Sequence, residues 1–281
     1  MKRASLNRRR LVDQVVRLLS LVAAFLALGA LGWILFEVFR RGGAALSFRL
    51  LTAAPTPPGV PGGGLGNAIL GSLMMTVLAA SIGVPLGILA GIFLAEYGTG
   101  SRLAEAVRFA ANVLMGVPSI LVGVFVYTVL VLPAGHFSGY AGAAALLVIM
   151  LPVMARTSED MLRLVPASLR EAGLALGVPR WRVTLGVVFR AAKVGLTTAG
   201  LLAVARISGE TAPLLFTALN SPYWPTSLNE PTANLTVTIF NYAMSPYADW
   251  KEQAWAASLL ITAGVLVLSI GSRTLLQRRR D

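Results

Sequence analysis

The stretch Arg170-Glu171-Ala172-Gly173-Leu174-Ala175-Leu176-Gly177 lies in a basic segment, 157–193, between two apolar runs. Pro166 is suited to the first turn of a short helix, and Gly177, with Pro179 behind it, is suited to end one. The segment therefore predicts two helices that meet near Gly177 and form an elbow on the water side of a membrane. A short helix exposed in this way is suited to docking a soluble partner.

The composition of the whole chain indicates a polytopic membrane protein. Of its 281 residues, 56% are hydrophobic and only 13% are charged, and the mean hydropathy is +0.73. A soluble domain does not bury so much apolar surface. The chain has no cysteine, which excludes disulfides, thiolate metal sites and a thiol nucleophile.

Six apolar runs are candidates to cross a bilayer, so the predicted fold is all-α with six transmembrane helices. Their approximate bounds are 18–39, 68–95, 111–132, 140–155, 194–218 and 254–272. A basic head precedes the first run, as in a signal peptide. Because this run is about 22 residues long and no small-x-small site closes it, we expect a retained helix.

These bounds divide the chain into three predicted parts. The first part, 1–64, holds the basic head, the first transmembrane helix and an external loop rich in proline and glycine. The core, 65–275, holds the other five spans and the elbow. A basic tail, 276–281, ends the chain.

The distribution of charge predicts the orientation of the chain. It carries 24 Lys and Arg residues against 12 Asp and Glu residues. If both termini are cytoplasmic, most of the cations fall in cytoplasmic segments, as the positive-inside rule requires. The net charge of +12 therefore reflects orientation and contact with lipid headgroups, and it does not indicate binding to nucleic acid.

A pair of charged residues falls inside the fifth predicted span. Arg206 and Glu210 are four residues apart, so a continuous helix would place them on one face, where they can pair. An ionised side chain at this depth costs roughly 3 kcal/mol on insertion scales. Ser208 and Thr211 add hydroxyl groups beside the pair, and Pro213 interrupts the backbone hydrogen bonds nearby.

Two roles for this pair remain open. It could be a structural ion pair that seals a helix bundle, or it could line a polar pathway, which is the interpretation we favour. Arginine suits a phosphate-like oxyanion because its planar guanidinium presents several donors to the oxygens of the anion.

Little in the sequence points to catalysis, a metal or a cofactor. His136, the only histidine, is expected in a short external turn without a carboxylate or Cys partner nearby in sequence. The hydrolase motifs HExxH and GxSxG are absent. The other acidic residues, among them Glu96 and Glu159, lie near span ends or in loops, where we expect them to be solvated.

The elbow resembles a motif of a known family. Glu171-Ala172-Gly173 followed by Gly177 is similar to the EAA-x3-G motif in the integral permease subunits of bacterial ABC importers. Nearly all of 65–271 resembles the type I permease domain of that family. Four stretches further resemble the permease subunits of phosphate importers, namely 63–76, 116–123, 206–217 and 241–255.

The resemblance implies a transport subunit with no enzyme activity and no cofactor. This chain would form half of a pathway with a second, homologous permease in the bacterial cytoplasmic (inner) membrane. A dimer of cytoplasmic ATPases would bind the elbow, whose motif residues are Arg170, Glu171, Ala172, Gly173 and Gly177. An extracytoplasmic phosphate-binding protein would deliver the substrate to a pathway that includes Arg206, Glu210, Ser208 and Thr211.

The sequence departs from the family pattern at two places. Gly173 replaces the third small residue of the motif, and Phe189-Arg190 stands where the family commonly has Leu-Pro, so the helix after the elbow is expected to continue without a break. Two rival functions remain open: a permease for another oxyanion or solute, and an intramembrane enzyme that acts on phosphorylated lipid.

Overall fold

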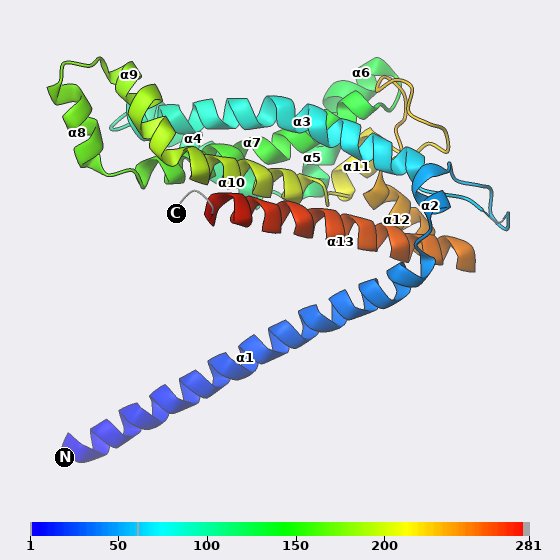
Figure 1. Cartoon of the computed structure of the whole chain (residues 1–281), viewed down its shortest axis with the longest axis horizontal. Coiled ribbons are helices and arrows are strands. Elements are labelled where there is room, and N and C mark those ends of the chain that lie inside the picture. The colour runs from blue at the N-terminus through cyan, green and yellow to red at the C-terminus, as the bar shows by residue number, and fades with distance from the viewer. Residues whose placement is uncertain (1, 61, 278–281) are drawn as a thin grey trace.

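The computed structural model describes residues 2–60 and 62–277 (Figure 1). Within these residues the chain folds into α-helices and short π-helical turns with no strand, which confirms the predicted all-α class. Five of the described helices are long and apolar enough to cross a membrane, and one bent pair provides a sixth crossing if it is counted as a single span. Of the predicted tail, 276–281, all but the first two residues lie outside the described residues.

The first span, α1 (Lys2–Ala45), projects away from the bundle (Figure 1). Its apolar window is not covered by the rest of the chain. Near its C-terminal end it packs on α13 (Ala248–Gln277), where the guanidinium of Arg41 lies 5.1 Å from the ring centroid of Trp255. The start of α1 and the end of α13 lie toward the same end of the molecule. The short helix α2 (Phe48–Thr52) follows α1.

The centre of the bundle is the pair α3 (Gly66–Ile92) and α7 (Gly139–Arg163), whose backbones approach closely. Gly83, Gly87 and Gly91 recur every four residues, so they lie on one face of α3. A Cβ at Gly87 would lie 2.6 Å from Cβ of Met154, and one at Gly91 would collide with Cβ of Ser158. Because these glycines leave no gap between the backbones, α3 and α7 form one closely packed unit.

The predicted third span, 111–132, is wrong in shape. α4 (Arg102–Gly116) and α5 (Ser119–Val126) meet at Val117-Pro118 with a bend of 104°. Proline lacks a backbone N–H and disfavours helical geometry in the residue before it, so the helix breaks there. Two short segments continue α5, namely η2 (Tyr127–Val131) and α6 (Leu132–Ala134).

The predicted fifth span, 194–218, also differs from the structure. A helix runs unbroken from the elbow through α9 (Arg180–Val183), η3 (Thr184–Val188) and α10 (Phe189–Ile207), as the absence of proline at 189–190 predicts. It ends at Ile207, and α11 (Ala212–Thr217) begins after a break at 208–211. Arg206 and Glu210 therefore do not share one continuous helix.

The other spans exceed their predicted bounds because polar helical turns extend past the apolar runs. α7 continues to Arg163 and α13 to Gln277. At the end of the bundle opposite the elbow, α12 (Leu235–Ala243) packs on α13, and the ring of Tyr242 stacks on Trp250 with centroids 4.5 Å apart. Burial raises the pKa of the Tyr242 hydroxyl.

Candidate functional site

A cavity of about 130 Å³ is lined by Arg206 and Glu210. It lies where the break after α10 faces the bend between α4 and α5. Apolar side chains of α4, α5 and α7 form most of its wall, and Ser119 adds a hydroxyl group at the bend. The two charged side chains thus share a small space that is otherwise largely apolar, where a charge is poorly solvated.

The position of this cavity along α7 indicates its depth. Val148, Ile149 and Val153 line it, and they lie 9 to 14 residues after the start of α7. At a rise of 1.5 Å per residue this is about 14 to 21 Å along the helix. If the hydrocarbon core, about 30 Å thick, begins near the start of α7, the cavity lies near the middle of that core.

The structure corrects the predicted geometry of the charge pair. Arg206 occupies the last turn of α10 and is exposed, whereas Glu210 lies in the break, where its backbone carbonyl accepts a hydrogen bond of 2.7 Å from Oγ1 of Thr236. In the described part of the chain no ion pair joins Arg206 to Glu210. The predicted pairing across one helical turn is wrong because the helix stops at Ile207. An arginine at this depth needs water, an anion or a partner subunit to solvate it.

Two predicted hydroxyl residues do not line the cavity. Oγ of Ser208 donates to the carbonyl of Val204 at 2.8 Å, and Ser208 lines a separate apolar groove between α3, α10 and α13. Thr211 precedes α11 and does not line the cavity. Ser119 provides the hydroxyl group at the cavity instead, and it was not predicted there because the sequence did not indicate the bend at Pro118.

The elbow contains the two helices that the sequence predicts. α8 (Ala167–Ala175) is separated from α9 by Gly177, whose φ of 73° lies in the left-handed region that favours glycine. The N–H of Gly177 bonds to the carbonyl of Leu174 at 2.9 Å, and the N–H of Val178 bonds to that of Gly173 at 3.3 Å. These two bonds form a Schellman motif, which ends α8.

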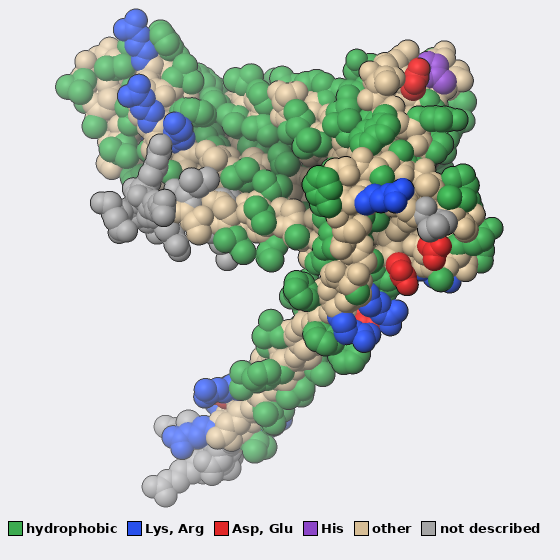
Figure 2. Space-filling view, turned by 45° about the vertical axis from the view of Figure 1, so that its right-hand side comes forward, with side chains coloured by type: hydrophobic (Ala, Val, Ile, Leu, Met, Phe, Trp, Pro, Cys, Tyr) green, Lys and Arg blue, Asp and Glu red, His purple; other side chains and the backbone are tan. Residues whose placement is uncertain are grey.

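Gly173 allows α8 to pack against α9. A Cβ at this position would lie 2.9 Å from Cγ2 of Val183, so the departure from the family motif permits a close approach. Glu171 and Leu174 of α8 are exposed, and so is Leu176, which follows α8; the exposure is 47% for Leu174 and 83% for Leu176. Figure 2 shows Lys and Arg side chains at this same end of the bundle. The elbow thus presents apolar and charged groups together at the molecular surface.

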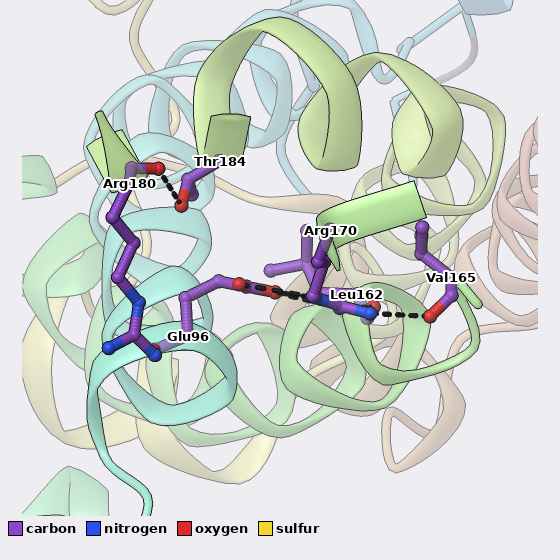
Figure 3. Close-up of polar contacts among 6 residues, drawn as sticks. All are labelled: Glu96, Leu162, Val165, Arg170, Arg180 and Thr184. Atoms are coloured by element: carbon purple, nitrogen blue, oxygen red, sulfur yellow. Dashed lines mark hydrogen bonds and ion pairs between the residues drawn. The ribbon is translucent and has the colours of Figure 1, made fainter. Parts of the chain in front are cut away.

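Arg170 is directed into the molecule rather than toward this surface (Figure 3). Its Nη2 lies 2.7 Å and its Nε 3.0 Å from Oε1 of Glu96, and it also donates to the carbonyls of Leu162 and Val165 at 2.8 and 2.5 Å. Glu96 belongs to the π-helical turn η1 (Phe93–Tyr97) at the end of α3 and is only 5% exposed. The expectation that Glu96 is solvated is therefore wrong.

Glu159 on α7 is also buried, with 0% exposure, contrary to the sequence-based expectation. Its Oε1 lies 2.8 Å from Nε of Arg108 and 2.8 Å from Nη2 of Arg163, and its Oε2 pairs with Arg156. One carboxylate thus holds three guanidinium groups from α4 and α7. Two of these partners could have been predicted from the sequence. Arg156 and Arg163 lie three and four residues from Glu159, and residues at this spacing are neighbours on a helix.

Comparison with known proteins relates the chain to transport permeases. Residues 83–281 match the family model described as the binding-protein-dependent transport system inner membrane component. The chain is 49% identical over 272 residues to the phosphate transport system permease protein PstA of Yersinia pestis, covering 97% of this chain and 92% of that protein. The PstA protein of Pasteurella multocida is 47% identical over 265 residues, covering 94% of each chain.

Two solved structures share the fold at low sequence identity. The MetNI methionine ABC transporter in inward-facing conformations matches with a TM-score of 0.63 at 19% identity, covering 76% of this chain and 95% of that chain. A bacterial alginate ABC transporter in complex with an alginate pentasaccharide-bound periplasmic protein matches with a TM-score of 0.63 at 16% identity, covering 94% and 93%. The helices described above therefore have the arrangement of an ABC importer membrane subunit.

Proposed function

This chain belongs to the family of inner-membrane components of binding-protein-dependent transport systems, and from this membership we propose that it is the permease subunit of an ATP-driven importer of inorganic phosphate. Relatives that are nearly half identical over almost the whole chain carry a name that specifies phosphate. The chain is a transport subunit and not an enzyme, because the ATPase of such transporters is a separate subunit.

The observation that carries the proposal is the position of Arg206. Its guanidinium is exposed beside a cavity of about 130 Å³ near the middle of the membrane, and it has no carboxylate partner among the described residues. A guanidinium binds a tetrahedral oxyanion through two parallel charge-assisted hydrogen bonds. Glu210 in the same cavity keeps the anion from being held too tightly, because its negative charge opposes that of the substrate.

The exposure of Arg206 supports a pathway that two chains complete. An arginine that faces hydrocarbon in an isolated subunit is costly, whereas one that faces a water-filled path between subunits is solvated. A second, homologous permease would cover this face of the chain. Each permease would then contribute one half of the translocation pathway.

The elbow supplies the proposed contact with a cytoplasmic ATPase dimer. Glu171, Ala172 and Leu174 of α8 are exposed to a partner, as is Leu176 just after α8. The basic residues of the segment favour the cytoplasmic side. The start of α1 and the end of α13 lie toward the same end as the elbow, which supports cytoplasmic termini in an inner membrane (Figure 1). An extracytoplasmic phosphate-binding protein would meet the opposite end of the bundle, near α12.

The same proposal assigns a role to each predicted part of the chain. Residues 65–275 would form the permease core with the elbow at 157–193, and 1–64 would add α1 and the external loop. Arg170 helps to position the elbow from within, because its guanidinium is bound to Glu96 and is not free for an ATPase.

Loss of this chain in its own cell tests the proposed substrate. Deletion of the gene should abolish ATP-dependent uptake of labelled phosphate at low phosphate concentration, and a plasmid copy should restore it. Uptake of labelled sulfate and methionine in the same cells should not change. Loss of sulfate or methionine uptake with normal phosphate uptake would assign the chain to another solute. Release of phosphate from lipid by the purified chain alone would instead support the intramembrane enzyme.

Replacement of Glu171 by Lys should weaken binding of the ATPase to the elbow. Glu171 is exposed and has no ion pair within the described residues, so its carboxylate is available to a partner. Reversal of its charge should lower the amount of ATPase that co-purifies with the permease about 10-fold or more, as expected for a close interfacial charge pair. Glu105→Lys, an exposed acidic position on α4, is the matched control. Undiminished co-purification with Glu171→Lys would contradict docking at this residue.

A further inference from the structure

Glu96 joins the elbow to α3 through both short helices of the elbow. Its carboxylate pairs with Arg170 of α8, and its backbone carbonyl accepts a hydrogen bond from Nη2 of Arg180 in α9. The guanidinium of Arg180 also lies 5.3 Å from the ring centroid of Tyr97. Figure 3 shows Arg170 and Arg180 on either side of Glu96. One residue of η1, the turn that continues α3, is thus held by two helices that lie more than 70 positions away in the chain.

These contacts differ from an ordinary surface ion pair. Glu96 is 5% exposed and the side chain of Arg170 is 22% exposed, so water screens their attraction only weakly. Arg170 also donates to the carbonyls of Leu162 and Val165, which lie at the end of α7 and just after it. A single guanidinium therefore ties α8 to the ends of both α3 and α7.

The same two helices lead to the cavity. α3 and α7 are closely packed along Gly83, Gly87 and Gly91, so a displacement of one carries the other with it. α7 then provides Val148, Ile149 and Val153 to the cavity wall. A continuous series of packed groups thus runs from α8 through Glu96 to the walls beside Arg206.

We propose that Glu96 is a positioning residue that makes α3 and α7 move with the elbow as one body. Force applied at α8 then reaches the cavity through α3 and α7, in addition to the direct covalent path through α10. Glu96 lies in the π-helical turn η1, and such turns are rare and often occur at functional positions. The predicted effect on transport rests on the proposed function. The predicted joint movement of α3, α7 and the elbow does not, because it concerns this chain alone.

A distance measurement tests the mechanical part. The chain contains no cysteine, so spin labels can be attached to Ser168→Cys on α8 and Thr99→Cys beyond the end of α3, both of which are exposed. In the complete complex the distance between the labels should be the same without nucleotide and with bound ATP. In the Glu96→Gln variant the distribution of distances between the two labels should broaden and shift when ATP binds. A wild-type distance that changes with ATP, or a Glu96→Gln distance that does not, would overturn the proposal.

A coupling measurement tests its consequence for transport. In vesicles that hold the complete complex, Glu96→Gln should lower the phosphate imported per ATP hydrolysed by about 2- to 30-fold, the range produced by changes along a coupling path. Glu96→Asp should recover most of the ratio of phosphate imported to ATP hydrolysed. Glu105→Gln, at an exposed position on α4, should leave this ratio unchanged. A parallel fall of uptake and ATP hydrolysis, with the ratio unchanged, would show a merely structural role and overturn the proposal. If the wild-type complex imports no phosphate, the proposed function fails, and the distance measurement still decides the role of Glu96.

Discussion

Replacement of Arg206 by Gln should lower ATP-dependent phosphate uptake by about 10- to 100-fold, because hydrogen bonds from a charged donor are worth about 1.5–3 kcal/mol. The side chain is exposed beside the mid-membrane cavity and forms no ion pair within the described residues, so its removal leaves no buried carboxylate behind. The complex should therefore assemble normally. Uptake of labelled phosphate, normalised to the amount of assembled complex in the vesicles, measures the effect.

Two further variants sharpen this test. Arg206→Lys retains the charge but loses the planar fork, so its uptake should lie between that of the wild type and that of Arg206→Gln. Arg102→Gln removes an exposed charge at the start of α4, outside both the elbow and the cavity, and should leave the rate of uptake unchanged. Normal uptake by assembled Arg206→Gln would remove Arg206 from the pathway and make its role structural.

Replacement of Glu159 by Ala should destabilise the folded permease by about 3 kcal/mol, the low end of the range for breaking a buried ion pair. Glu159 has 0% exposure, and without its carboxylate the guanidinium groups of Arg108, Arg156 and Arg163 repel one another. The arginines are partly exposed, so water reduces the cost to this lower value. The midpoint of unfolding in a detergent titration measures the change.

Asp160→Ala is the matched control for this variant. Asp160 is the next residue of α7 but is exposed, so the midpoint of unfolding should stay close to that of the wild type. Equal midpoints for Glu159→Ala and the wild type would contradict a stabilising role for the cluster. Partial recovery of stability when Arg108→Ala is added to Glu159→Ala would identify charge repulsion as the cause.

The sequence was sufficient to predict the helical class, the existence of five continuous candidate spans and the elbow, because these features depend on local signals. Length and hydropathy identify a span, and Gly177 followed by Pro179 marks the end of α8. The bend at Val117-Pro118 was not predicted, since hydropathy does not report the direction of a helix. The interruption of the backbone hydrogen bonds near Pro213 was predicted, but the end of the helix at Ile207 was not. Pro118 was visible in the sequence, yet membrane helices often tolerate proline, so it did not predict a bend.

The burial of Glu96 and Glu159 could not be predicted for a different reason. Arg170 is 74 positions from Glu96, and Arg108 is 51 positions from Glu159, so only the packing of distant helices brings them together. The sequence placed both carboxylates near the water-side ends of spans, where the prior expectation is solvation. The residues that line the candidate cavity could not be predicted for the same reason. Ser119 lies beside the same cavity as Arg206 only because of the bend between α4 and α5.

The most direct test of the proposed function is uptake of labelled phosphate by sealed vesicles that contain the proposed complex, namely this chain, a second permease, an ATPase dimer and a phosphate-binding protein. Phosphate should accumulate only when ATP is supplied on the side of the elbow and the binding protein on the opposite side, and excess unlabelled sulfate or methionine should not compete. Accumulation of another solute in the same vesicles, with no ATP-dependent uptake of phosphate, would contradict the assignment of this chain as a phosphate permease.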